Sequence, residues 1–141
     1  MANLLNLDTF SDSRGNLTVI ERIIPFEIKR LFYIYGVDSS VRGKHRHRKT
    51  IQAAICLVGR CTISSDDGKR VQHFVLDNPR SCVLLEPEDW HLMYDFSQDA
   101  ILMVLASENY DAGDYIFEPY RPFGQLHRTT ANKPELVLQP L

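Results

Sequence analysis

Two histidines, His45 and His47, are separated by one residue in the basic stretch GKHRHRK. In an extended strand, residues two apart project from the same face, so the two imidazoles share one face while Lys44 and Arg46 project from the other. An imidazole pair can bind a metal ion, exchange protons near neutral pH, or lie in solvent without a chemical role. The spacing alone leaves these three interpretations open.

The composition of the chain fits one folded domain, with 141 residues, a formal net charge of -2 and 44% hydrophobic residues. This charge gives no basic field for nucleic acid, so we predict no nucleic-acid partner. No apolar run reaches the roughly 20 residues of a membrane span, and residues 1–10 lack the features of a signal peptide. We therefore predict a cytoplasmic protein without a membrane partner. Cys56, Cys61 and Cys82 follow neither zinc nor disulfide spacing and are expected to be buried thiols.

Short runs rich in Val, Ile, Phe and Tyr recur along the chain, whereas helical periodicity is hard to find. Such runs, separated by turn residues, predict an all-β fold, with a sandwich, a jelly roll or a small closed barrel as the candidate architectures. The predicted strands cover residues 16–20, 28–35, 51–58, 60–65, 70–76, 82–86, 90–96 and 100–106. The clearest hairpin joins 60–65 to 70–76, because Asp67 and Gly68 supply the positive φ of a tight turn.

The last third of the chain differs in character. Residues 108–123 are aromatic and acidic with irregular spacing, which predicts a loop or short helical turns laid over the β-domain. Residues 124–141 are predicted to form a weakly structured tail, or an arm that docks elsewhere. We therefore expect one domain over residues 1–123 and a short irregular C-terminal extension over 124–141.

The order of these motifs resembles the cupin superfamily, in which an HxH pair, a Glu and a Gly form a first motif and a later His belongs to a second. Here Gln52 stands at the Glu position, Gly59 at the Gly position and His91 at the later His. A metal-binding cupin generally needs the carboxylate to offset the charge of a divalent ion, and a neutral amide replaces it. We therefore predict no metal and no cofactor. A metal-dependent cupin enzyme that uses the three histidines and Gln52 is the alternative.

A closer resemblance covers nearly the whole chain up to Phe123. The segments DSRGNLTVIE, IPFEIKRLFYIY, RGKHRHRK, the run from Pro87 to Ser97 and VLASENYDAGDYI resemble the sugar 3,4-ketoisomerases that act on dTDP-4-keto-6-deoxyglucose. The resemblance implies an isomerase built on a cupin jelly roll of two antiparallel sheets, usually a homodimer with strand exchange. It also implies a dTDP-linked keto-deoxyhexose as substrate, on a route to 3-amino-3,6-dideoxy sugars of bacterial surface glycans.

Moving a ketone from C4 to C3 requires removal of the C3 proton, an enediol or enediolate, and return of a proton at C4. We predict His45 as the base and His47 as the proton donor or shuttle. Arg42 and Tyr33 are the predicted donors to the enediolate oxygens, since each fixed donor stabilises such a transition state by about 3 kcal/mol.

Substrate binding needs guanidinium groups for the diphosphate and an aromatic or apolar platform for the thymine. Arg14, in the SRG turn, is a predicted contact. Lys29 and Arg30 face opposite sides of one strand, and the resemblance favours Arg30 as the side chain inside the barrel. Trp90 is the candidate platform, although a lone Trp in a β-barrel more often belongs to the core. The galacto branch of the resembled family carries Arg in this turn and His after Trp, as Arg14 and His91 do here, so the 3-keto-6-deoxygalactose product is favoured.

Two departures from the resembled family concern the surroundings of the histidines. An acidic residue commonly follows the paired histidines near Ile51 and is absent here, and Phe117 replaces a basic residue expected after DYI. A non-catalytic sugar-nucleotide binding module remains an alternative. A cupin-fold 3,5-epimerase is a further one, but its pattern of His with Asp and Tyr is not found.

Overall fold

The computed structural model describes residues 1–128 and confirms the prediction of an all-β fold, because these residues form twelve strands and no α-helix. The strands are β1 (Asn3–Asn6), β2 (Asp8–Asp12), β3 (Gly15–Val19), β4 (Arg30–Ile34), β5 (Arg42–His47), β6 (Gln52–Val58), β7 (Cys61–Asp66), β8 (Val71–Leu76), β9 (Ser81–Leu85), β10 (Trp90–Tyr94), β11 (Ile101–Ala106) and β12 (Tyr115–Ile116). Two short 3-10 helices, η1 (Ala112–Asp114) and η2 (Phe123–Gln125), interrupt the C-terminal segment.

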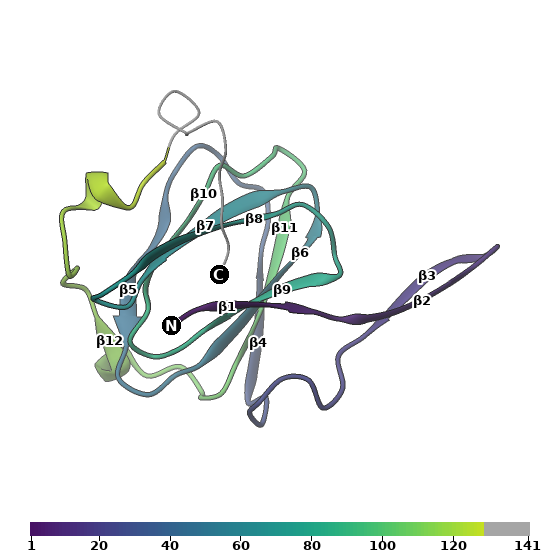
Figure 1. The fold of residues 1–141 in the computed structure, drawn as a ribbon, viewed down its shortest axis with the longest axis horizontal. Helices are drawn as coiled ribbons and strands as arrows, with labels where there is room; N and C mark the ends of the chain where they lie inside the picture. Colours follow the sequence, from purple (N-terminus) through teal and green to yellow (C-terminus); the bar gives the residue numbers. More distant parts are fainter. Residues whose placement is uncertain (129–141) are drawn as a thin grey trace.

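Two five-stranded antiparallel sheets face each other, as predicted for a cupin jelly roll (Figure 1). The first sheet has the strand order β1-β9-β6-β11-β4, and the second has the order β12-β5-β10-β7-β8. No strand is shared between these two sheets, so the barrel is open rather than closed. Both β5 and β10, which carry the histidines of the sequence motifs, are neighbours inside the second sheet.

The main core lies between the two sheets. It includes Cys56 of β6, Ile63 of β7, Phe74 of β8, Leu102 of β11 and Val83 of β9, all of them buried. Because strand side chains alternate in direction, Ala53 and Ile55 of β6 point to the outer face of the first sheet, where Leu7, Ile24 and neighbouring apolar residues cover them. Burial on both faces explains why the sequence of β6 is apolar without alternation. The three cysteines are buried and free, as predicted.

The β7–β8 hairpin forms as predicted, with Asp66 paired to Val71 next to the turn. Gly68 adopts a positive φ of 95°, and the Asp67 carboxylate accepts hydrogen bonds from the backbone N–H groups of Lys69 and Arg70. The side chain of Asp67 therefore fixes the turn that the sequence indicated.

A second hairpin, β2–β3, extends away from both sheets (Figure 1). The sequence predicted only its second strand. Phe10 and Leu17 face each other in register and are 64% and 60% exposed. A hairpin with such exposed apolar side chains has no core of its own within one chain.

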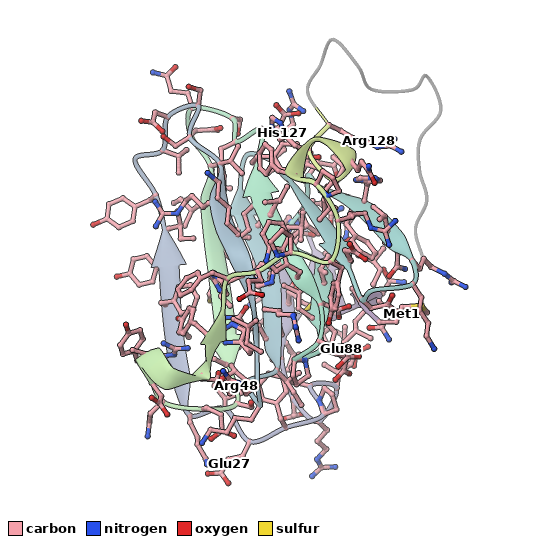
Figure 2. All side chains as sticks on the ribbon, turned by 90° about the vertical axis from the view of Figure 1, so that its left-hand side faces the viewer. Met1, Glu27, Arg48, Glu88, His127 and Arg128 are labelled. Carbon is pink, nitrogen blue, oxygen red and sulfur yellow. The ribbon has the colours of Figure 1, made fainter. Side chains whose placement is uncertain are left out.

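The C-terminal segment runs along the outer face of the second sheet from β12 to His127 and Arg128 (Figure 2). It is attached by a hydrogen bond from Trp90 Nε1 to the Phe117 carbonyl and by an ion pair of 2.7 Å between Arg121 Nε and the buried Asp66. Leu126 is fully buried against Trp90 and its neighbours, so packed structure continues past the predicted domain end at residue 123. Residues 129–141 of the predicted tail lie outside the described residues. Between residues 1 and 128, no helix has the length and apolarity to cross a membrane.

Candidate active site

A bulge in β5 sets the position of the paired histidines. Gly43 and Lys44 both have positive φ values, of 90° and 63°, and the pairing with β10 shifts from His91–His45 to Leu92–Gly43. Lys44 is therefore the extra residue, and the bulge redirects the strand just before His45. A Cβ on Gly43 would lie 2.8 Å from the His91 carbonyl oxygen, so only glycine allows this close approach.

Replacement of Gly43 by alanine is expected to lower the free energy of unfolding by about 2 to 3 kcal/mol, because it combines strained φ with a clash against the backbone. Gly36→Ala is the matched control, since Gly36 also has positive φ, 63°, but a Cβ there meets nothing within 4 Å. Urea denaturation of both variants checks the prediction. Equal losses of stability would show that the contact with His91 is unimportant.

Three histidine rings lie together at the end of the second sheet. The ring centroid of His45 is 4.9 Å from that of His47 and 4.8 Å from that of His91, and the His47 and His91 centroids are 6.2 Å apart. The Tyr115 ring lies 4.6 Å from His45 and 4.8 Å from His47. The sequence prediction that His45 and His47 share a face agrees with these distances. Lys44 and Arg46 lie on the other face, over Phe123 and Tyr120.

Each histidine is held through its Nδ1 atom. The Nδ1 of His45 lies 2.9 Å from the Gly43 carbonyl oxygen, that of His91 3.1 Å from the Asp89 carbonyl oxygen, and that of His47 2.9 Å from a carboxylate oxygen of Asp114. These acceptors require the neutral rings to carry their hydrogen on Nδ1, which leaves Nε2 with a free lone pair. The Nε2 atoms of His47 and His91 are buried without a hydrogen-bond partner. The site therefore holds fixed imidazoles with unused acceptor nitrogens.

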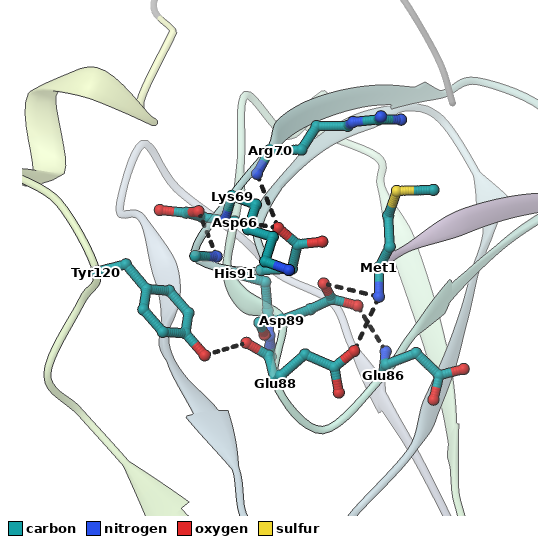
Figure 3. Close-up of polar contacts among 11 residues, drawn as sticks. Met1, Asp66, Lys69, Arg70, Glu86, Glu88, Asp89, His91 and Tyr120 are labelled. Atoms are coloured by element: carbon teal, nitrogen blue, oxygen red, sulfur yellow. Dashed lines mark hydrogen bonds and ion pairs between the residues drawn. The ribbon is translucent and has the colours of Figure 1, made fainter.

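The turn between β9 and β10 positions His91 (Figure 3). The Asp89 side chain accepts a hydrogen bond of 2.7 Å from the Glu86 N–H, which closes the turn, and the Asp89 carbonyl then accepts the hydrogen bond from His91. Burial raises the pKa of Asp89 to about 6. The same local turn thus fixes both the direction and the tautomer of the His91 ring.

The three site histidines are neutral near pH 7. Burial lowers the pKa of His45 to about 4 and that of His91 to about 3. Burial also lowers the pKa of His47, but the Asp114 carboxylate opposes this shift. His47 is the only one of the three whose ring contacts a carboxylate, so it is the imidazole best suited to accept a positive charge.

His45 and His91 line a pocket of about 140 Å³ between the sheets, whereas His47 is buried beside it and does not line it. Arg42 and Gln52 supply polar groups, and the Gln52 side-chain oxygen is buried without a partner. The remaining lining residues are Phe32, Ile34, Gly43, His45, His91, Met93 and Tyr115. The pocket therefore combines apolar side chains with converging polar groups, as sites for small organic ligands do.

Arg30 lies beside this pocket, on the same face of β4 as Phe32 and Ile34, in agreement with its predicted direction. Its guanidinium lies 5.4 Å from the centroid of the Phe32 ring and 5.8 Å from that of Tyr110, and its Nε is buried without a partner. Lys29 instead forms an ion pair of 3.8 Å with Glu108. Of Lys29 and Arg30, Arg30 is therefore the one on the pocket side.

Two predicted site residues do not reach the pocket. Tyr33 is 61% exposed on the opposite face of β4, because it alternates with the inward-facing Phe32 and Ile34. Trp90 is 3% exposed and packs with Leu126, because its direction is opposite to that of the adjacent His91. The predictions of Tyr33 as an enediolate donor and Trp90 as a thymine platform therefore find no support in the geometry of this chain.

Arg14 lies in the turn of the β2–β3 hairpin, outside both sheets (Figure 1). Its side chain is 88% exposed and forms an ion pair of 2.7 Å with Asp12 in the same turn. Within one chain, the hairpin keeps this residue away from the histidine pocket. A contact between Arg14 and a ligand in such a pocket would require a second chain.

Sequence reasoning missed Asp114 and Tyr115, which β12 brings against β5. Tyr115 pairs with His47, and the Asp114 carbonyl accepts a hydrogen bond of 2.9 Å from the Arg48 N–H. Residues 108–123 were predicted to lie over the β-domain, but a two-residue strand gives no periodic signal. The acidic residue next to Tyr115 was the only sequence feature that pointed to a carboxylate near the histidines.

The described side chains are not arranged as a metal-binding site. Within residues 1–128, no group of three or more His, Cys, Asp or Glu side chains is arranged to hold a metal ion. The arrangement therefore gives no support to the alternative of a metal-dependent cupin enzyme.

Comparison with known proteins identifies the class of protein. The family model FdtA, described as WxcM-like, C-terminal, matches residues 1–128. A TDP-4-oxo-6-deoxy-alpha-D-glucose-3,4-oxoisomerase of Aneurinibacillus thermoaerophilus is 44% identical over 116 residues, covering 80% of this chain and 84% of that protein. Two solved structures from Campylobacter jejuni, WlaRA, a TDP-fucose-3,4-ketoisomerase, and WlaRB, a TDP-quinovose 3,4-ketoisomerase, are each 38% identical. Both cover 83% of this chain, with 89% and 92% of their own chains and TM-scores of 0.77 and 0.79.

The fold and the histidine pocket, together with these relatives, define a cupin-like isomerase of the 3,4-ketoisomerase type. The chain belongs to the FdtA family, described as WxcM-like, C-terminal.

Proposed function

We propose that this protein converts dTDP-4-keto-6-deoxyglucose into a dTDP-3-keto-6-deoxyhexose. The observation that carries the proposal is the arrangement of His45, His47 and His91. Their Nδ1 atoms are anchored, which leaves the Nε2 nitrogens as acceptors, and His45 and His91 line the pocket. The Aneurinibacillus relative, 44% identical, is named for this reaction type on TDP-4-oxo-6-deoxyglucose. The reaction moves protons and has no net redox change, so it requires no cofactor in this proposal.

Proton transfer proceeds through an enediolate. His45 Nε2 takes the proton from C3, which leaves the negative charge on the C4 oxygen, and the proton of the C3 hydroxyl then moves to the C4 oxygen through solvent. His47, which takes up a proton from solvent at Nε2, delivers it to C4, and this step leaves a ketone at C3 and a hydroxyl at C4. Release of the C3 proton from His45 to solvent restores the starting state. The separation of 4.9 Å between the two ring centroids suits groups that act on adjacent carbons.

Arg42 stabilises the negative charge that develops on the oxygens of this intermediate. Arg42 is exposed at one end of β5 but lines the pocket with His45 and Gln52, so its guanidinium can donate hydrogen bonds to a developing oxyanion. Arg30 adds a second positive charge on the pocket side and contacts the sugar or the diphosphate. His91 completes the wall of the hexose site.

The product favoured at C4 is the galacto epimer, with Arg14 and His91 as the residues that distinguish it. The WlaRA and WlaRB proteins, named for TDP-fucose and TDP-quinovose, match this chain with equal identity, so overall similarity does not select the epimer. The 3-keto product is then a substrate for transamination, on a route to 3-amino-3,6-dideoxy sugars of surface glycans. The cytoplasmic location stays a prediction.

The active form is a homodimer in which the β2–β3 hairpins are exchanged. The hairpin exposes Phe10 and Leu17, and β4, at the edge of the first sheet, exposes Leu31 and Tyr33. Apolar surface and an open sheet edge are what a second copy would cover. In such a dimer, Arg14 reaches the diphosphate bound to the partner subunit, which explains its distance from the pocket of its own chain.

Incubation of the purified protein with dTDP-4-keto-6-deoxyglucose, followed by NMR, tests the proposed reaction. We expect a signal for a 3-keto product in ordinary water and deuterium at C4 of the product when the reaction is run in heavy water. The coupling constants at C4 then report the epimer. Binding of the substrate without turnover would support a non-catalytic binding module instead.

Activity is expected to persist well below neutral pH and to fall as the pH drops through about 4. Because the pKa of His45 is lowered to about 4, the neutral base survives to lower pH than an ordinary histidine allows. A profile of kcat/KM against pH checks the acid limb.

Stability is also expected to fall below about pH 6.5. Burial lowers the pKa of His91 to about 3, and partial burial lowers that of His73 to about 4, so the unfolded chain binds protons at these histidines more tightly than the folded chain does. Circular dichroism at each pH separates unfolding from titration, and an acid limb near 6.5 in folded protein would contradict the assignment.

A further inference from the structure

We infer that Asp114 is the positioning residue for His47, which it holds with Nδ1 protonated and whose imidazolium form it stabilises. The inference rests on the proposed function, and it names the carboxylate that the sequence around the paired histidines lacks. Neither Asp114 nor His47 lines the pocket, but the His47 ring lies beside the pocket residues His45 and Tyr115, so the effect of Asp114 passes through His47.

Asp114 is a buried carboxylate with a full set of donors. One of its oxygens accepts the hydrogen bond from His47 Nδ1, at 2.9 Å, and one from the Thr50 hydroxyl. The other accepts the backbone N–H groups of Lys49, at 2.8 Å, and Arg48, at 3.1 Å. Its side chain is 3% exposed. Burial would raise the pKa of Asp114, but the hydrogen bonds from Thr50 and Lys49 outweigh burial and keep the group ionised.

The local fold aims this carboxylate at His47. Asp114 ends the η1 helix, whose first turn is capped by the Asp111 side chain accepting from the Gly113 N–H. The chain then enters β12, which pairs with β5 so that Tyr115 lies opposite His47. The two residues that follow β5, Arg48 and Lys49, in turn donate their backbone N–H groups to the Asp114 carboxylate. The carboxylate and the imidazole are therefore held by the same strand pairing, 67 residues apart in the sequence.

His47 differs from its two neighbours because of this contact. The rings of His45 and His91 donate to backbone carbonyls, which fix the tautomer but carry no net charge. The negative charge of Asp114 raises the pKa of His47, whereas the positive charge of Arg30 on β4 lowers it. The other groups facing His47 are His45 on its own strand, His91 on β10 and Tyr115 on β12. Asp114 therefore separates the roles of two otherwise similar imidazoles, with His47 as the one better suited to take up a proton.

Asp114→Asn tests the inference in the full-length protein, with turnover of dTDP-4-keto-6-deoxyglucose and NMR of ¹⁵N-labelled histidines as separate readouts. We expect kcat to fall about 10- to 100-fold with KM changed less than about threefold, because the pocket surface is unaltered. The His47 titration is expected to move to lower pH, since the stabilising charge is lost. An asparagine amide can also donate to Nδ1, so the ring is expected to shift toward the Nε2-protonated tautomer.

Two further variants separate positioning from a merely structural role. Thr50→Val removes a hydrogen bond to the same carboxylate oxygen but leaves the charge, and it is expected to keep kcat within about threefold and the His47 titration unchanged. Asp114→Glu keeps the charge and is expected to restore part of the activity. An unchanged titration and tautomer of His47 in Asp114→Asn would overturn the inference, as would equal losses in Thr50→Val. If the wild-type protein does not turn over the substrate, the proposed function fails, and the His47 titration alone decides the role of Asp114.

Discussion

Replacement of His45 by asparagine is expected to lower kcat for the ketone transfer by about 10³- to 10⁴-fold while leaving the binding of dTDP nearly unchanged. Removal of a general base commonly costs two to four orders of magnitude in rate. Asparagine can occupy the place of the imidazole but cannot take a proton from carbon. The hydrogen bond between His45 and the Gly43 carbonyl is local, so its loss disturbs little of the surrounding structure.

The measurement combines substrate turnover with isothermal titration of dTDP. His73→Asn is the matched control, because His73 also has a pKa lowered to about 4 by burial, but it contacts Ser64 on β7 and not the pocket. The control is expected to retain full turnover. Normal turnover in the His45 variant would show that His45 is not the base, whereas loss of dTDP affinity would indicate a structural role.

Strand alternation made much of the site predictable from the sequence. It placed His45 and His47 on one face and Lys29 and Arg30 on opposite faces, and the family resemblance selected Arg30 for the pocket side. The same rule, applied fully, directs two residues that were chosen by chemical type away from the pocket. Tyr33 lies between inward-facing Phe32 and Ile34, and Trp90 precedes inward-facing His91, so neither lines the pocket of its own chain.

The rest of the site depends on contacts that local sequence patterns do not encode. Asp114 meets His47 only because a two-residue strand pairs with β5, and two residues are too few to show a period. The bulge at Gly43 and Lys44 also has no local signal beyond the glycine itself. These features are set by tertiary packing, and a carboxylate expected next to the histidines in sequence was found 67 residues away.

Mixing two inactive variants, Arg14→Ala and His45→Asn, is expected to restore activity if the hairpins are exchanged between subunits. Arg14→Ala alone loses substrate affinity, since a charged contact to a diphosphate contributes about 1.5 to 3 kcal/mol. Its effect on stability is small, because the Arg14 side chain is exposed and contacts only Asp12 of the same turn. In a mixed dimer, one pocket combines His45 of one chain with Arg14 of the other, and the second pocket carries both substitutions.

Random exchange of subunits at equal concentration places about a quarter of all pockets in the intact combination, so about a quarter of wild-type activity is expected at low substrate concentration. The variants are mixed after mild dissociation in denaturant and refolding, with each variant refolded alone as the control. If Arg14 served the pocket of its own chain, no dimer would contain an intact pocket, and the mixture would not exceed the mean of the two variants. Such a result would contradict hairpin exchange. Exchange is the expected outcome because Arg14 is 88% exposed and lies outside both sheets, so a second chain must bring the ligand to it.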